Sequence, residues 1–195
     1  MKFKDVQEQR VRAYFIQATR ELLKSEGLKS VSVRSIADRA GYSYATLYNY
    51  FTDIQELIFL CVKDFQDECR EFIQAADHGQ NPGPDRLRIR IMNYMAYFTE
   101  YPGIFELFFL ERMADIQLKE PVSAEIFNFL SVLTNEDWEV IRSQQGVTEE
   151  EIEARKHQMN FLITGLLIFY LNRRQPLSYE SFLQLASSQV SRILE

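Results

Sequence analysis

The decisive stretch of this chain is residues 31–57, VSVRSIADRAGYSYATLYNYFTDIQEL, which predicts two short helices around a tight turn. Ser32 stands where a side-chain hydroxyl accepts hydrogen bonds from the first turn of a helix. Gly41 ends that helix, because glycine adopts a positive φ without steric cost, and Ser43 then caps a second helix over residues 44–50. A helix, a glycine turn and another helix in so short a stretch are typical of a unit that enters a DNA groove.

The residues inside this unit satisfy the packing that such a short turn imposes. Two helices joined this closely cross steeply and touch where they cross, which requires small side chains at the contact. Ala37 and Ala40 meet that requirement. Ile36, Leu47 and the ring of Tyr50 lie at helical spacing and are expected to form a small core.

The order of these residues resembles the helix-turn-helix of the tetracycline-repressor-like (TetR) family of bacterial transcription regulators. The matching positions are Gly27, Ile36, Ala37, Ala40, Gly41, Ser43, Thr46, Leu47, Tyr48, Tyr50, Phe51, Glu56 and Leu57. The resemblance implies that the second helix of the motif is the recognition helix. It also implies an all-α fold, with an N-terminal three-helix helix-turn-helix DNA-binding domain at residues 1–52 and a C-terminal helical ligand-binding and dimerisation domain at residues 53–195.

The recognition helix and its surroundings supply the candidates for DNA contact. The predicted DNA-binding residues are Arg34, Ser43, Tyr44, Ala45, Thr46, Tyr48, Asn49 and Tyr50. We expect the hydroxyl groups of Ser43, Thr46 and the two tyrosines at 48 and 50 to donate to phosphates and so fix the register. Tyr44, Ala45 and Asn49 are candidates for base edges. Two alternatives to DNA contact stay open: Tyr50 is mainly a core residue, and Arg34 is only exposed to solvent.

One position departs from the resembled family. Where the family usually has a lysine at the start of the next helix, this chain has Ile54, so that phosphate contact is not expected. The N-terminus of this helix still offers backbone N–H groups and a helix dipole to a phosphate. Its capping box is either Thr52 with Gln55 or Asp53 with Glu56.

The distribution of charge favours nucleic acid at one end of the chain. The 195 residues are 46% hydrophobic and carry a net charge of −6. Residues 1–52 hold nine Lys or Arg against five Asp or Glu, a net charge of +4, and the remainder hold thirteen against twenty-three, a net charge of −10. A basic end attracts phosphates while an acidic body is repelled by them. The alternative is that +4 is ordinary surface charge.

Helical periodicity runs through the rest of the chain. The first helix is expected over residues 5–26, where Asp5 and Glu8 form a possible capping box and one side carries Val6, Tyr14, Phe15, Ala18 and Leu22. A long helix is expected over residues 53–77. The further predicted helices lie near residues 84–100, 102–116, 121–145, 149–174 and 178–194.

Aromatic side chains are concentrated in the middle of the predicted body. The candidates for lining a ligand pocket are Phe65, Phe98, Tyr101, Phe105, Phe108, Phe109 and Phe127. Apolar and aromatic side chains line most small-molecule sites, so these rings suit a small-molecule effector. Aromatic residues at helical spacing also form plain cores, and this alternative stays open for each ring.

The last two predicted helices carry more apolar surface than one chain needs. Residues 161–171 are apolar on every side of a helix, apart from the small Thr164 and Gly165, and such a helix must be covered all round. Pairing with a second copy as a four-helix bundle would cover it, which the resemblance also implies. The predicted dimer interface comprises Phe161, Thr164, Gly165, Ile168, Phe182, Leu185, Gln189 and Ile193. The alternative is that this pair closes the core of a monomer.

The sequence gives no indication of a disulfide, a metal site, an enzyme or a membrane span. Cys61 and Cys69 lie on one predicted helix, about 12 Å apart along its axis, which is too far for a disulfide. His78 and His157 lack metal-ligand spacing, so neither a metal nor another cofactor is expected. An enzyme is not expected either, because the sequence has no nucleophile–base pair and no glycine-rich phosphate loop. The longest apolar run is too short to span a membrane, and a cytoplasmic protein is expected.

The sequence as a whole predicts a ligand-responsive repressor that binds a near-palindromic double-stranded DNA operator as a homodimer. A small molecule of unknown identity would enter the helical body, shift the long helix and lower the affinity for the operator. Within the resembled family, a transcription activator is the alternative. From a different class, the alternative is a helical protein-interaction or RNA-binding module that reuses a helix-turn-helix.

Overall fold

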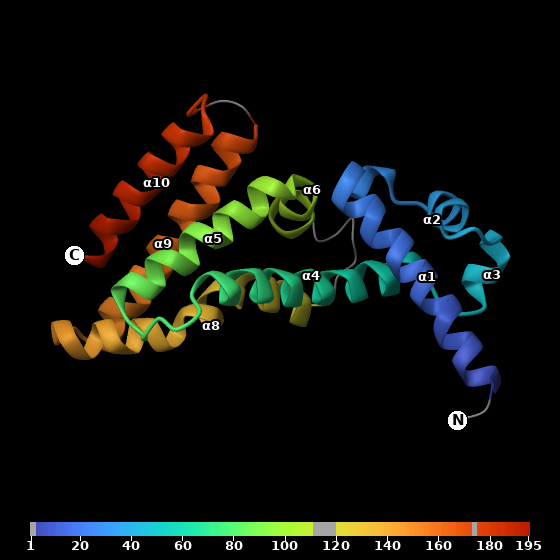
Figure 1. Cartoon of the computed structure of the whole chain (residues 1–195), viewed down its shortest axis with the longest axis horizontal. Coiled ribbons are helices and arrows are strands. Elements are labelled where there is room, and N and C mark those ends of the chain that lie inside the picture. The colour runs from blue at the N-terminus through green and yellow to red at the C-terminus, as the bar shows by residue number, and fades with distance from the viewer. Residues whose placement is uncertain (1–2, 111–119, 173–174) are drawn as a thin grey trace. The chain divides into compact units, whose positions relative to one another are not determined.

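The computed structural model describes residues 3–110, 120–172 and 175–195, and every regular element in these ranges is a helix (Figure 1). Its helices are α1 (Phe3–Glu26), η1 (Leu28–Ser30), α2 (Val33–Ala40), α3 (Tyr44–Tyr48), α4 (Ile54–Ala76), α5 (Pro84–Glu100), α6 (Pro102–Phe105), η2 (Glu106–Leu110), α8 (Glu120–Gln145), α9 (Glu149–Leu171) and α10 (Tyr179–Leu194). The predicted all-α fold, with an N-terminal helix-turn-helix and a helical C-terminal domain, is confirmed.

Contacts between residues divide the chain into two compact units. Unit 1 comprises residues 1–67 and 101–126, and unit 2 comprises residues 68–100 and 127–195. Helix α4 therefore contributes its first part to unit 1 and its last part to unit 2. The predicted boundary between residues 52 and 53 stays a prediction about where the functional domains separate.

The helix-turn-helix begins and turns where the sequence predicts. The Ser32 hydroxyl accepts from the backbone N–H of Ser35, whose own hydroxyl accepts from the N–H of Ser32, so both ends of a capping box are present. Gly41 follows α2 with φ 75° and ψ 28°, the left-handed conformation that glycine adopts most easily. Ser43 caps α3 through the N–H of Thr46.

Helix α3 ends at Tyr48, two residues before its predicted end at Tyr50. The N–H of Asn49 donates to the carbonyl oxygen of Thr46, and the N–H of Tyr50 to that of Leu47. These bonds span three residues, so they tighten the last turn and end the α-helical pattern. Asn49 and Tyr50 therefore lie just after α3.

The core of unit 1 forms behind the helix-turn-helix, against α1. Its buried members are Val11, Phe15, Ala18, Leu22, Ile36, Leu47, Phe51 and Leu57. The Phe15 ring is central, with centroid distances of 5.4 Å to Tyr42, 6.4 Å to Tyr50 and 6.2 Å to Phe51. Ile54 also packs against this cluster. The residue that replaces the lysine of the resembled family thus adds apolar contact to the core.

Several predicted helix ends differ from the observed ones. Helix α1 begins at Phe3, two residues before the predicted start, so Asp5 lies inside its first turn. The predicted helix over 102–116 is α-helical only to Phe105 and then π-helical to Leu110, and residues 111–116 lie outside the described ranges. Helix α9 ends at Leu171, with Asn172 after it, and the rest of the predicted span also lies outside the described ranges.

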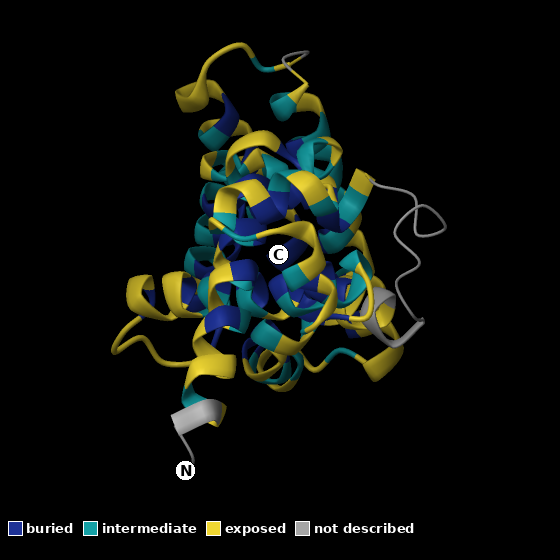
Figure 2. Ribbon diagram, turned by 90° about the vertical axis from the view of Figure 1, so that its right-hand side faces the viewer, coloured by how far each residue is buried: buried dark blue, intermediate teal, exposed yellow. Residues whose placement is uncertain are grey.

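Unit 2 is built from α5, α8, α9, α10 and the end of α4. Helix α10 packs against both α9 and α5, and α9 also packs against α5. Figure 2 shows that the buried residues lie on the inner faces of the helices and the exposed ones on the outer faces. Trp138 on α8 and Phe182 on α10 are among the largest fully buried side chains. None of the helices in the described ranges has the length and apolar content to cross a membrane.

Candidate nucleic-acid interface

Helix α3, the predicted recognition helix, presents one face to solvent. Tyr44 and Tyr48 are 66% and 55% exposed, and Ala45 and Asn49 are exposed as well. Leu47 is fully buried on the opposite side and so fixes the rotation of α3 about its own axis. The packing of the motif therefore brings the three predicted base-edge residues to a single outer surface, together with Tyr48.

Ser43 and Thr46 share one hydrogen-bonded cap at the start of α3. The Oγ atom of Ser43 accepts from the backbone N–H of Thr46 at 3.1 Å, and the two hydroxyl oxygens lie 2.8 Å apart. One hydroxyl therefore donates to the other, and only one of the two hydroxyl hydrogens is left for another acceptor. This cap offers one phosphate contact, where the sequence predicted a contact from each residue.

Tyr50 and Arg34 occupy different environments. Tyr50 is partly buried, its ring packs near Phe15, and its carbonyl oxygen accepts from Arg12. These contacts match the core alternative that the sequence left open for Tyr50. The side chain of Arg34 is 92% exposed, and its Nε lies 3.9 Å from Oδ2 of Asp38. Because an exposed pair at that distance is weak, Arg34 can reach another anion.

Arg12 on α1 holds the end of the motif in place and was not predicted. Its guanidinium carbon lies 4.3 Å from the centroid of the Phe51 ring, and its Nη2 lies 3.3 Å from Oε1 of Glu56. It also donates to the carbonyl oxygen of Tyr50. The partners of these hydrogen bonds lie 38 and 44 residues away in sequence, so no local pattern identifies this residue.

The N-terminus of α4 carries carboxylates where the sequence left a phosphate contact possible. Oδ1 of Asp53 accepts from the N–H of Glu56 at 2.9 Å, and Oε2 of Glu56 accepts from the N–H of Thr52 at 3.0 Å. The observed cap thus contains one half of the predicted Asp53–Glu56 box, while the Glu56 side chain reaches back to Thr52 instead of Asp53. Two negative charges at this helix end, with N–H groups already bonded, disfavour a phosphate there.

Tyr14 on α1 also differs from its prediction. The sequence places it on the same side as Phe15, yet it is 55% exposed while Phe15 is fully buried. Successive helical residues are rotated by about 100°, so the two side chains point in different directions. The Tyr14 ring lies 6.1 Å, between centroids, from that of Tyr42 in the turn before α3. It therefore lies beside the predicted DNA-binding surface.

The predicted ligand-binding aromatics are divided between the two units. Phe65, Tyr101, Phe105, Phe108 and Phe109 belong to unit 1, whereas Phe98 and Phe127 belong to unit 2. Within unit 1, the ring centroids of Phe105 and Phe109 are 5.1 Å apart, and Nζ of Lys24 lies 4.4 Å from the centroid of Tyr101.

The two predicted ligand-binding rings in unit 2 differ sharply in their exposure to solvent. Phe98 is fully buried and its ring packs edge-on against Tyr94 at 4.8 Å between centroids. Phe127 is 49% exposed, and its ring lies 6.4 Å from that of His157. Phe127 therefore lies on the surface of the α8–α9 pair, and its place in a ligand pocket stays a prediction.

The two cysteine thiols are buried and poorly reactive. Burial raises the pKa of Cys61 to about 12, with a smaller contribution from Asp64. The pKa of Cys69 is also raised, chiefly by burial. Only the thiolate is an effective nucleophile, so these groups are inert near neutral pH.

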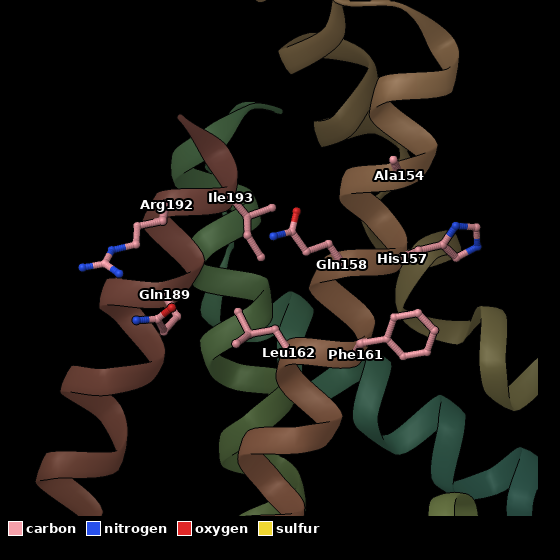
Figure 3. A pocket seen from close by; sticks show the side chains of 8 residues that line it. All are labelled: Ala154, His157, Gln158, Phe161, Leu162, Gln189, Arg192 and Ile193. Carbon is pink, nitrogen blue, oxygen red and sulfur yellow. The ribbon is translucent and has the colours of Figure 1, made fainter.

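The outer surface of α9 and α10 contains several of the predicted dimer residues. An open groove of about 710 Å³ is lined by Ala154, His157, Gln158, Phe161, Leu162, Gln189, Arg192 and Ile193 (Figure 3). Gln158 and Leu162 point toward α10, whereas His157 and Phe161 project from another side of α9 (Figure 3).

The predicted interface residues are exposed to different extents. Phe161 is 68% exposed and Leu185 40%, while Thr164, Gly165, Ile168 and Gln189 are partly exposed and Ile193 is buried. Phe182 is fully buried and stacks on Tyr170 at 4.3 Å between ring centroids. The prediction is therefore corrected for Phe182, because its ring fills the core of its own chain and cannot contact a partner.

In the described residues, a helix-turn-helix with an exposed α3 precedes a helical second part. Residues 15–61 match the family model described as bacterial regulatory proteins of the tetR family. The helix-turn-helix segment of this chain is therefore similar to that of the TetR family of bacterial transcription regulators.

Solved structures share the fold along nearly the whole chain. A TetR family transcription regulator from Marinobacter aquaeolei VT8 is 20% identical, with a TM-score of 0.66 and 97% of each chain covered. The transcriptional regulator FadR from Bacillus subtilis, in complex with stearoyl-CoA, is 13% identical, with a TM-score of 0.71 and 94% of this chain and 98% of that chain covered. RolR in complex with resorcinol is 16% identical, with a TM-score of 0.68 and coverages of 96% and 88%.

Proposed function

We propose that this protein is a ligand-responsive repressor that binds a near-palindromic DNA operator as a homodimer. The observation that carries the proposal is the outer face of α3, where Tyr44, Ala45, Tyr48 and Asn49 are exposed opposite the buried Leu47. A rigidly held helix with exposed polar and aromatic side chains fits the major groove, and the surrounding basic residues attract the phosphates. Acting on chromosomal DNA, the protein works in the cytoplasm.

The contacts divide into those that fix the register and those that read sequence. Tyr48 and the Ser43–Thr46 cap donate to phosphates, and the exposed Arg34 adds a charge contact. Tyr44, Ala45 and Asn49 reach the base edges, where an asparagine amide pairs well with adenine and a ring or methyl group contacts a thymine methyl.

The first test is binding of DNA from the region immediately upstream of this chain's own gene, compared with random DNA of equal length. Retardation of the upstream DNA in a gel, but not of the random DNA, supports a DNA-binding regulator. The retardation should weaken as salt is added, because phosphate contacts release counterions. Absence of retardation even at low salt would favour the alternative, a protein-interaction or RNA-binding module. Transcription from the same promoter in the presence of the protein separates a repressor from an activator.

Replacing Tyr48 with phenylalanine is expected to weaken binding to the upstream DNA and to random DNA by a similar factor of about ten. A hydrogen bond to a charged acceptor contributes about 1.5 kcal/mol, and a phosphate contact carries no sequence information. Fluorescence anisotropy with both DNAs measures the two affinities.

The matched control is Tyr179→Phe, which removes a hydroxyl from a 44% exposed tyrosine at the start of α10 and should leave both affinities unchanged. Unchanged affinity of Tyr48→Phe for both DNAs would contradict the phosphate role. A loss restricted to the upstream DNA would instead assign Tyr48 to base readout.

The dimer is proposed to form through the exposed surface of α9 and α10. Phe161 is a large apolar side chain that remains 68% exposed beside the groove, and Leu185 adds apolar area on α10. An exposed apolar surface of this kind marks an association site, and a two-fold dimer presents two recognition helices to a palindrome.

Replacing Phe161 with glutamate is expected to convert the dimer to a monomer and to lower operator affinity by at least tenfold. A charge at the centre of an apolar interface would be desolvated without a partner, and a monomer has only one recognition helix. Light scattering coupled to size exclusion gives the mass, and anisotropy gives the affinity. Leu177→Glu, at an 86% exposed position before α10, is the control and should stay dimeric. A monomeric native protein, or a dimeric Phe161→Glu variant, would refute this interface.

A small-molecule effector completes the proposed function. FadR and RolR have the same fold and were solved with stearoyl-CoA and resorcinol, which differ widely in size. We therefore expect this chain to respond to a small molecule whose chemistry is set by its own side chains. An effector that binds the DNA-free state more tightly lowers operator affinity by the ratio of its two binding constants. Retardation of the upstream DNA in the presence of candidate compounds identifies it.

A further inference from the structure

Tyr14 is an exposed tyrosine to which the recognition mechanism above gives no role. In the described part of unit 1, the exposed large hydrophobic side chains are Tyr14, Tyr44, Tyr48 and Leu110. Three of these four are tyrosines of the helix-turn-helix and its supporting helix, and two already belong to the proposed DNA surface. Single exposed apolar residues need no explanation, but this grouping suggests a shared surface.

The Tyr14 ring is supported by the turn that leads into α3. Its neighbour Tyr42 packs on the core through Phe15 at 5.4 Å, while its ring lies 6.1 Å from that of Tyr14. The N–H of Tyr42 donates to the carbonyl oxygen of Ala37 at 3.0 Å, which fixes the turn. A ring that rests on a fixed neighbour loses little conformational entropy when it binds, because tyrosine has only two side-chain torsions.

The position of Tyr14 suits the edge of a DNA groove. Tyr42 directly precedes Ser43, so Tyr14 lies near the N-terminal end of α3 but on a different helix. The N-terminal residues of a recognition helix reach the base edges, and the phosphate backbones run along both sides of that groove. Arg10, exposed one turn earlier on α1, lies on the same face of the helix as Tyr14.

We propose that Tyr14 is a positioning residue for DNA binding, whose hydroxyl donates to a phosphate beside the bases that α3 contacts. The proposal rests on the DNA-binding function proposed above. The contact fixes the register of the helix-turn-helix from α1, independently of the contacts made by α3 itself. A tyrosine hydroxyl is uncharged, so this contact adds affinity without releasing a counterion.

The test compares Tyr14→Phe, Tyr48→Phe and Arg10→Gln in the full-length protein, using the upstream DNA and random DNA at several salt concentrations. We expect Tyr14→Phe to weaken binding to both DNAs by about fivefold to tenfold, with the slope of log affinity against log salt unchanged. Arg10→Gln should reduce that slope by about 0.9, as expected for one lost phosphate charge. The melting temperature of the DNA-free Tyr14→Phe variant should equal that of the native protein.

Three results would overturn the proposal. Native affinities of Tyr14→Phe for both DNAs, with Tyr48→Phe still weakened, would remove Tyr14 from the interface and leave the proposed function intact. A weakened Tyr14→Phe variant with a lowered melting temperature would assign the residue to folding. No specific binding by the native protein would overturn the proposed function and this inference together. Tyr179→Phe again serves as the control for loss of an exposed hydroxyl.

Discussion

Replacing Asp137 with alanine is expected to lower the free energy of unfolding by about 3–5 kcal/mol, the usual effect of removing one partner of a buried ion pair. The Asp137 carboxylate is fully buried on α8. Its Oδ1 accepts from Nε of Arg86 at 2.6 Å and from the N–H of Gly83 at 3.0 Å, and its Oδ2 accepts from Nη1 of Arg90 at 3.0 Å.

The size of this effect depends on the buried donors that lose the Asp137 carboxylate as their acceptor. The side chains of Arg86 and Arg90 are each only 9% exposed, so water cannot replace the lost partner fully. Arg90 keeps hydrogen bonds to the carboxylate of Asp77 and to the carbonyl oxygen of Leu133, but the N–H of Gly83 loses its acceptor. A buried donor without an acceptor adds its own penalty to that of the two arginines, each of which loses one carboxylate partner.

The neighbouring residue Glu136 provides a matched control. It accepts from Nη2 of Arg86 at 2.9 Å, but its side chain is 72% exposed. The hydrogen bond from Arg86 lowers the pKa of Glu136, yet water screens an exposed pair. Glu136→Gln should therefore leave stability nearly unchanged. Guanidinium unfolding followed by circular dichroism measures both variants, and equal stabilities of the two would contradict the proposed importance of the Asp137 carboxylate.

Replacing Gly103 with alanine is the second change expected to have a large effect. A Cβ atom at Gly103 on α6 would lie 2.3 Å from the carbonyl oxygen of Leu23 and 3.4 Å from Cα of Gly27. Both are backbone atoms of the segment that ends α1, so no side-chain rotation relieves the overlap. Helix α6 must move away from α1, and such overpacking typically destabilises by about 1–3 kcal/mol or more.

Gly165 on α9 is the control for this substitution. A Cβ atom there would meet nothing within 4 Å in its own chain. Alanine is favoured over glycine inside a helix by about 0.5–1 kcal/mol, so Gly165→Ala is expected to stabilise the chain. Thermal and guanidinium unfolding of the two variants should give changes of opposite sign. A native stability for Gly103→Ala would show that α6 can shift without loss of packing.

Local sequence patterns predicted most of the helix-turn-helix. Ser32, Gly41 and Ser43 act through neighbours within a few residues, so their hydrogen bonds could be inferred from spacing alone. The buried Leu47 and Ile36 followed from helical periodicity in the same way. The end of α3 could not be placed, because a continued helix and a tightened last turn are compatible with the same residues.

Side-chain surroundings depended on contacts between distant segments. Tyr14 and Phe15 are adjacent and both aromatic, and only the crossing of α1 with the helix-turn-helix leaves one exposed and buries the other. Phe182 likewise fits an interface by pattern, yet Tyr170 across the α9–α10 pair covers it. Periodicity gives the apolar side of a helix but does not say which neighbour covers it.

By itself, the sequence determined the fold class, the helix-turn-helix and the face of α3 that meets solvent, since these depend on capping, glycine conformation and periodicity over a few residues. Only the tertiary structure decided that Arg12 holds the end of the motif, that Asp137 joins two buried arginines and that Tyr14 lies beside the recognition helix. Those contacts join residues on separate helices, so they arise from how the helices pack and leave no pattern in the local sequence.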